Sequence, residues 1–75
     1  MSAPGVPTLH WIGLRAAYLR HARQLSTRQL ARRAHLRSHT SIIALEHGTN
    51  VRLSTLLAVV QGLDVSLPEF FSEPI

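Results

Sequence analysis

Five histidines are the side chains best suited to chemistry in this sequence of 75 residues, which contains no cysteine. His35 and His39 are four residues apart, a spacing that puts two imidazoles on one face of a helix. We expect His35 to lie in a turn, and no thiol or carboxylate accompanies the pair. The sequence therefore predicts no metal site, and it indicates no cofactor.

Acid–base or nucleophilic catalysis is equally poorly supported. No two of the acids form a close pair along the chain, and no serine has a positioned base. The four acids are Glu46, Asp64, Glu69 and Glu73. We expect a protein that is not an enzyme.

Arginine supplies the strongest signal. The net charge is +4 with neutral histidines, and residues 1–45 contain seven arginines and no acid. The seven are Arg15, Arg20, Arg23, Arg28, Arg32, Arg33 and Arg37, and only Arg52 follows them. A basic half predicts an anionic partner, with nucleic acid first and a membrane surface second. The alternative is a solvated basic face without a partner.

The length allows one domain and no second core. Residues 1–8, with two prolines and a glycine, predict an irregular tail, and residues 9–75 a single domain. The tail lacks the basic and apolar regions of a signal peptide, and the longest apolar run, Leu56–Val60, is too short to span a bilayer. We expect a cytoplasmic protein with no membrane partner, although Trp11 and Tyr18 could anchor a first helix at a membrane surface.

The first helix is expected to begin at Leu9 and to be apolar on two faces. The inward stripe comprises Ile12, Ala16, Leu19 and Arg23. The second stripe comprises Trp11, Leu14, Tyr18 and Ala22. A helix with two apolar faces usually contacts two things. The second stripe is covered either by another part of this chain or by a partner protein.

Two short helices follow. Ser26 and Gln29 fit a capping box that starts a helix from Thr27 to about His35. Ser38 is the next good cap, for a helix over His39–His47 that Gly48 terminates. The inward residues of this pair are expected to be Leu30, Ala31, Ala34, Ile42 and Leu45.

The C-terminal part predicts two more helices. The first covers Leu53–Gly62, with Leu56, Val59, Val60 and then Leu63 inward. Ser66 and Glu69 form a second capping box, which opens a short fifth helix through Phe71. No alternating strand pattern is present. Five short helices make an all-α fold, and the tight connection between the second and third is typical of a helix-turn-helix.

Over residues 12–71 the sequence resembles the Cro and phage-repressor (XRE-like) helix-turn-helix proteins. The matching positions are Ile12-Gly13, Leu19-Arg20, Leu25-Ser26, Leu30-Ala31, Ala34, Ile42, Leu45-Glu46, Gly48, Leu53, Leu56 and Leu63–Leu67. The resemblance implies a lambda-repressor-like DNA-binding domain whose third helix enters the major groove.

The resemblance also implies a role for individual residues. His39, Thr40, Ser41 and Ala44 would face base edges. Residues implied to contact the DNA backbone are Thr27, Arg28, Arg37, Ser38, His47, Asn50 and Arg52. Arg20 and Glu46 would form an ion pair between the first and third helices. Histidines near DNA further predict binding that strengthens as the pH falls.

The chain departs from the family pattern at three points. The turn between the second and third helices is one residue longer, and the loop before Leu53 is one residue shorter. His35 occupies the position where the family commonly has a glycine with positive φ. The base-facing positions hold no arginine, glutamine or asparagine, so we expect moderate sequence specificity, with most affinity coming from phosphates.

The sequence thus predicts a transcriptional regulator that acts as a repressor. It is expected to bind double-stranded DNA as a homodimer on an inverted repeat. The surfaces expected to bind a second subunit or a partner comprise Leu67, Phe70, Phe71, Trp11, Leu14 and Tyr18. Phage repressors, restriction–modification controllers and antitoxins are three possible settings. The alternative function is a protein-interaction module that binds a toxin or another regulator with the same fold.

Overall fold

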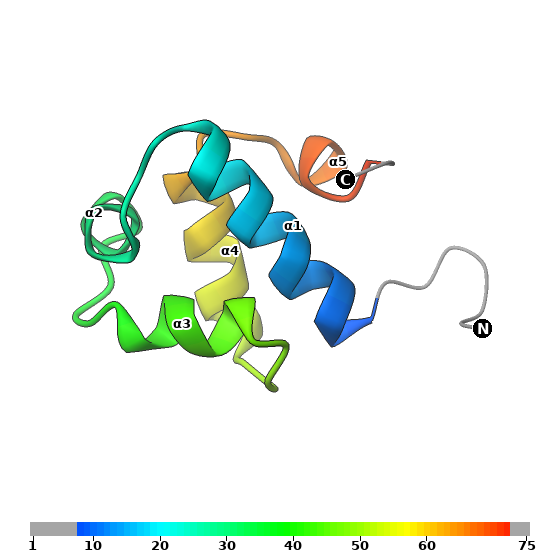
Figure 1. Cartoon of the computed structure of the whole chain (residues 1–75), viewed down its shortest axis with the longest axis horizontal. Helices are drawn as coiled ribbons and strands as arrows, with labels where there is room; N and C mark the ends of the chain where they lie inside the picture. The colour runs from blue at the N-terminus through cyan, green and yellow to red at the C-terminus, as the bar shows by residue number, and fades with distance from the viewer. Residues whose placement is uncertain (1–7, 73–75) are drawn as a thin grey trace.

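The computed structural model describes residues 8–72 and folds them into five helices without a strand (Figure 1). In chain order they are α1 (Leu9–Ala22), α2 (Thr27–Arg33), α3 (Thr40–Glu46), α4 (Leu53–Gly62) and α5 (Leu67–Phe70). The α2–α3 pair lies at one end of the molecule, and α5 lies at the other (Figure 1). This confirms the predicted all-α fold. The tail expected over residues 1–8 falls outside the described residues except for Thr8, the N-cap of α1.

Both predicted capping boxes are present. Ser26 Oγ accepts a hydrogen bond from the Gln29 amide (3.0 Å), and Gln29 Oε1 accepts one from the Ser26 amide (2.8 Å). Ser66 and Glu69 repeat the arrangement at α5, with distances of 3.2 and 3.0 Å. Each box satisfies two amides at a helix start, so α2 and α5 begin where the sequence predicts.

The helix ends depend on residues with positive φ. Gly48 follows α3 with φ +77°, as predicted, and His35 takes φ +58° at the end of α2. Gln24 (+57°) and Asp64 (+60°) do the same after α1 and α4. A residue in the left-handed conformation lets the chain turn sharply after each of the first four helices, and only glycine adopts that conformation without steric cost.

Four helix bounds differ from the prediction. The second helix ends at Arg33 rather than near His35, and the fifth ends at Phe70 rather than Phe71. The third begins at Thr40, with His39 in place of Ser38 as its N-cap, and ends at Glu46 rather than His47. Ser38 Oγ instead accepts a 3.2 Å hydrogen bond from the Thr40 amide, the first of the helix. The serine lies one residue too early to take the N-cap position.

The core is formed where the inward faces of all five helices meet. Its buried apolar residues are Ala16, Leu19, Leu30, Ala31, Ala34, Ile42, Leu45, Val59, Val60, Leu63 and Phe70. The prediction that Arg23 contributes its stem to the inward stripe is wrong, because Arg23 is exposed at the C-cap of α1.

An aromatic cluster joins α5 to α1. The Trp11 and Phe71 rings stack with centroids 6.0 Å apart, and the edge of Phe70 meets Trp11 at 6.4 Å. Phe70 is completely buried, whereas the sequence assigned it to a partner surface. Trp11 and Phe71 are partly buried against the same core. The chain's own α5 therefore covers the N-terminal part of the second stripe.

Arg15 stabilises the same contact. Its Nε donates a 2.8 Å hydrogen bond to the Phe70 carbonyl, and its Nη2 donates one of the same length to the Glu69 carbonyl. Arg15 is only 8% exposed. The sequence counted it in the basic half that would face DNA, but the structure uses it to satisfy the last carbonyls of α5.

Candidate nucleic-acid interface

Close packing of α3 against α1 sets the position of the candidate interface. A Cβ atom at Gly13 would lie 2.5 Å from the Leu45 carbonyl oxygen and 2.7 Å from that of Glu46. Only a glycine lets the two helix backbones approach this closely. The contact fixes the C-terminal end of α3 against α1.

An ion pair holds the same two helices together. Arg20 Nε donates to Glu46 Oε2 (2.6 Å) and Nη2 donates to Oε1 (3.0 Å), while Nη1 donates to the Leu25 carbonyl (2.9 Å). The hydrogen bonds to Glu46 raise the pKa of Arg20, against the opposing effect of burial. Between residues 8 and 72 no other ion pair forms, so α3 presents no unpaired carboxylate.

A side-chain hydrogen bond joins the N-termini of α2 and α3. Thr27 Oγ1 lies 3.0 Å from Nδ1 of His39. Thr27 is the first residue of α2 and His39 the N-cap of α3, so the two proposed DNA-contacting helix starts are adjacent. The bond also commits Nδ1 and leaves the Nε2 atom of His39 available to another partner.

The outer face of α3 is accessible and polar at its start. Ile42 and Leu45 point into the core, with exposed fractions of 0% and 1%. The residues predicted to face bases lie around the rest of the helix, with Thr40 exposed and His39, Ser41 and Ala44 half-buried. Ser38 and Thr40 hydroxyls lie 3.0 Å apart, so the first turn carries a connected pair of hydroxyls.

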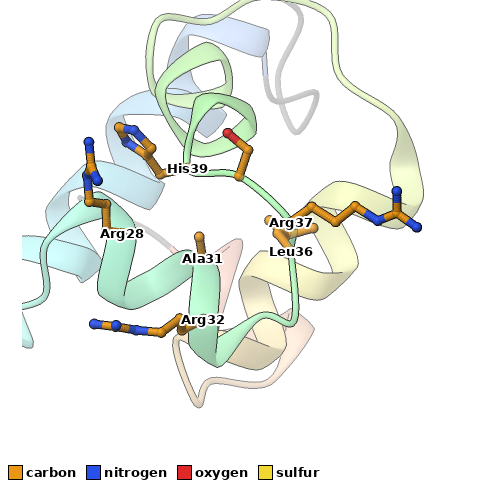
Figure 2. Close-up of a pocket in the computed structure, with 7 residues that line it drawn as sticks. Arg28, Ala31, Arg32, Leu36, Arg37 and His39 are labelled. Atoms are coloured by element: carbon orange, nitrogen blue, oxygen red, sulfur yellow. The ribbon is translucent and has the colours of Figure 1, made fainter.

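The residues predicted to contact the DNA backbone divide into two groups. Arg28, Arg37 and Ser38 line an open depression of about 290 Å³ together with His39, and the side chains of Arg28 and Arg37 point away from each other (Figure 2). The remaining lining residues are Ala31, Arg32 and Leu36. Sequence reasoning assigned no role to Arg32, although its spacing of four residues from Arg28 puts the two on one helix face.

The second group lies beyond the other end of α3. His47 is its C-cap, Asn50 follows in the loop, and Arg52 is the N-cap of α4. All three are exposed. Cationic or polar side chains therefore lie at both ends of α3, and half-buried Thr27 contacts the N-cap of α3 from the start of α2.

Apolar side chains are also exposed, away from α3. On α1, Leu14 (46% exposed) and Tyr18 (51%) remain uncovered from the second stripe, and the Arg15 guanidinium lies 5.8 Å from the Tyr18 ring centroid. Leu67 on α5 is 44% exposed. Sequence reasoning missed Leu53 and Leu57, which are exposed on α4 because the core contacts its other face.

Among the helices that the structure describes, none is both long and apolar enough to cross a bilayer.

Two solved structures are similar to this one. Wild-type restriction-modification controller protein C.Esp1396I matches with a TM-score of 0.76 and 25% sequence identity, covering 84% of this chain and 83% of that chain. A mutant of the same protein has the same TM-score and identity and covers 84% and 80%. No protein-family model matches the chain. No curated protein matches it either. The structural likeness confirms the predicted helix-turn-helix fold.

Proposed function

We propose that this protein is a sequence-specific regulator of transcription that binds double-stranded DNA. The observation that supports it most directly is the 3.0 Å contact between Thr27 and His39, which joins the two helix starts at a cationic surface. The one carboxylate of α3, Glu46, is neutralised by Arg20. The likeness to a restriction-modification controller protein points the same way.

In the proposed complex, α3 enters the major groove with its N-terminus first. His39, Thr40 and Ser41 offer hydrogen bonds to base edges, and Ala44 offers a methyl contact to thymine. Arg28, Arg37 and Ser38 on one side, and His47, Asn50 and Arg52 on the other, bind the phosphates of the two strands. Arginine guanidinium groups suit phosphate because they are planar and donate several hydrogen bonds.

We further propose a homodimer that binds an inverted repeat and represses transcription. Exposed leucines on α4 and α5, Leu53, Leu57 and Leu67, supply apolar surface for a second subunit. Two α3 helices would then enter successive major grooves about 34 Å apart. Among the settings considered, the controller likeness favours a restriction–modification system.

The test selects a duplex from a random pool and measures affinity for it against salt concentration. If a dimer contacts about eight phosphates, the slope of log affinity against log salt is about −7. Selection of an inverted repeat and a two-to-one complex in sedimentation would support the dimer. A slope near zero on every duplex would contradict DNA binding.

Thr40 provides the test of sequence reading. Thr40→Ala is expected to reduce discrimination at one base pair by roughly tenfold, since a good base contact contributes about 1–3 kcal/mol. Ser54→Ala, an exposed residue in α4, is the matched control. If Thr40→Ala weakened binding to all DNA sequences equally, Thr40 would not specify a base.

A second candidate function is a module that binds a protein, such as a toxin. The exposed Leu14 and Tyr18, one turn apart on α1, favour it because no other part of residues 8–72 covers them fully. Tyr18→Glu would then abolish the protein complex while leaving the salt slope on DNA unchanged.

A further inference from the structure

Ile43 is an apolar side chain of α3 that the core does not use. Ile42 and Leu45 of the same helix are buried in the core, whereas Ile43 is only half-buried. Within residues 8–72, the partly buried apolar side chains that pack against the core do not include Ile43. Core packing therefore does not explain an isoleucine at this position.

The helical period places Ile43 on the outer face of α3. Successive residues are about 100° apart around a helix axis, so Ile43 lies about 100° from Ile42 and about 160° from Leu45. Thr40, three residues earlier, and His47, four residues later, share its side of the helix, and both are exposed. Ile43 thus lies between two polar residues on the side of α3 that faces away from the core.

The chemistry of the major groove limits what such a side chain can contact. The base edges present hydrogen-bond donors and acceptors there, and the one methyl group among them is at C5 of thymine. An isoleucine that covered a donor or acceptor would remove that group from water without replacing its hydrogen bond, which is unfavourable. Contact with the thymine methyl group instead removes two apolar surfaces from water at once.

Taking the proposed DNA binding as its basis, we propose that Ile43 specifies a thymine through its C5 methyl group. Ile43 adjoins Ala44 and has the longer side chain, and the two form an apolar strip about 100° wide on the outer face of α3. Along the helix, this strip lies between His39 and Thr40 at the start and His47 at the end. Sequence reasoning did not count Ile43 among the base-facing residues.

Uracil substitution tests the contact on the selected duplex. Uracil keeps the hydrogen-bonding groups of thymine and lacks only the methyl group. At one thymine in each half-site, uracil should weaken binding of the parent protein about fourfold, the factor that corresponds to one buried methyl group at about 0.8 kcal/mol. At that position Ile43→Ala should bind the thymine and uracil duplexes equally, because the side chain that contacts the methyl group is gone.

Val65→Ala is the matched control. Val65 is also a half-buried, β-branched residue, but it lies between α4 and α5 and packs against the core. Val65→Ala should unfold at a lower urea concentration and keep the fourfold preference for thymine over uracil. Ile43→Ala should keep the urea midpoint of the parent protein. Ile43→Val, which removes a single methylene group, should keep part of the preference.

The outcomes separate the methyl contact from the proposed function. If uracil had no effect at any position, or if Ile43→Ala retained every uracil effect, the methyl contact would be overturned, while a steep salt slope would leave DNA binding intact. If the salt slope of the parent protein were flat on every duplex, the proposed function itself would be overturned.

Discussion

Arg15 and Phe70 are 55 residues apart in sequence, yet Arg15 Nε donates a 2.8 Å hydrogen bond to the Phe70 carbonyl. The same guanidinium reaches the Glu69 carbonyl and, at 3.4 Å, Ser72 Oγ. One buried cation thus satisfies the end of α5 and holds its aromatic residue in the core.

Replacing Arg15 with methionine should detach α5. The change leaves the Phe70 and Glu69 carbonyls without their donor, which costs about 1–3 kcal/mol. We expect faster amide exchange in α5 and a red-shifted Trp11 fluorescence, because Trp11 stacks on Phe71. Arg23→Met, at an exposed arginine, should show neither effect. An unchanged exchange rate in Arg15→Met would contradict the role of Arg15.

Acid should release the same helix. Hydrogen bonds from Ser66, first its backbone amide and then its hydroxyl, hold the pKa of Glu69 below its ordinary value near 4.5. The carboxylate therefore stabilises the fold above that value, and the contribution is lost as the pH falls through the lowered pKa. Trp11 fluorescence from pH 6 to pH 2 should report the change. The Glu69→Gln variant should lack this acid-dependent change in fluorescence. If its acid profile were identical to that of the parent protein, the role of Glu69 would be refuted.

The close contact at Gly13 predicts that adding a single methyl group there pushes α1 and α3 apart. Helix propensity alone would make Gly13→Ala stabilising by about 1 kcal/mol. Overpacking against backbone oxygens, which cannot rotate away, costs more, so we expect a net loss of about 1–2 kcal/mol in urea unfolding. Gly62→Ala, whose Cβ would lie 3.1 Å from the Cβ of Ala34, should lose less. If Gly13→Ala stabilised the protein, the two helices could move apart without a loss in the free energy of unfolding, and the prediction would be wrong.

The ion pair between α1 and α3 predicts a coupling. Glu46→Gln should destabilise the fold by about 2 kcal/mol, because it leaves a largely buried guanidinium without its charge partner. Asp64→Asn, at an exposed acid, should be close to neutral. Replacing both Arg20 and Glu46 with methionine should lower the free energy of unfolding by less than the sum of the losses in the two single methionine variants. Strict additivity of the two would contradict the pairing.

Local signals account for what the sequence predicted well. The capping boxes at Ser26 and Ser66 and the glycine after α3 act within a few residues, so helix starts and ends follow from neighbouring side chains. Leu30 and Ile42 followed from the helical period alone. Where the turn carried an additional residue, at Ser38, the predicted start was wrong by one position.

Tertiary contacts account for the rest. Composition treats Arg15 and Arg32 alike, yet one is buried under α5 and the other lines an open depression. Phe70 was assigned to a surface because its contact with α1 joins residues far apart in the sequence, and local patterns do not reveal such contacts. The base-facing and backbone-contacting roles of residues in α2 and α3 stay predictions for the DNA experiments.

The left-handed residues offer a way to strengthen this molecule without changing its proposed DNA contacts. Gln24 and Asp64 end α1 and α4 at positive φ, where a side chain costs about 1–2 kcal/mol that glycine avoids. Both residues lie outside the α2–α3 unit. Thermal tolerance and DNA recognition can therefore be engineered independently in this chain, the first at the ends of α1 and α4 and the second along α3.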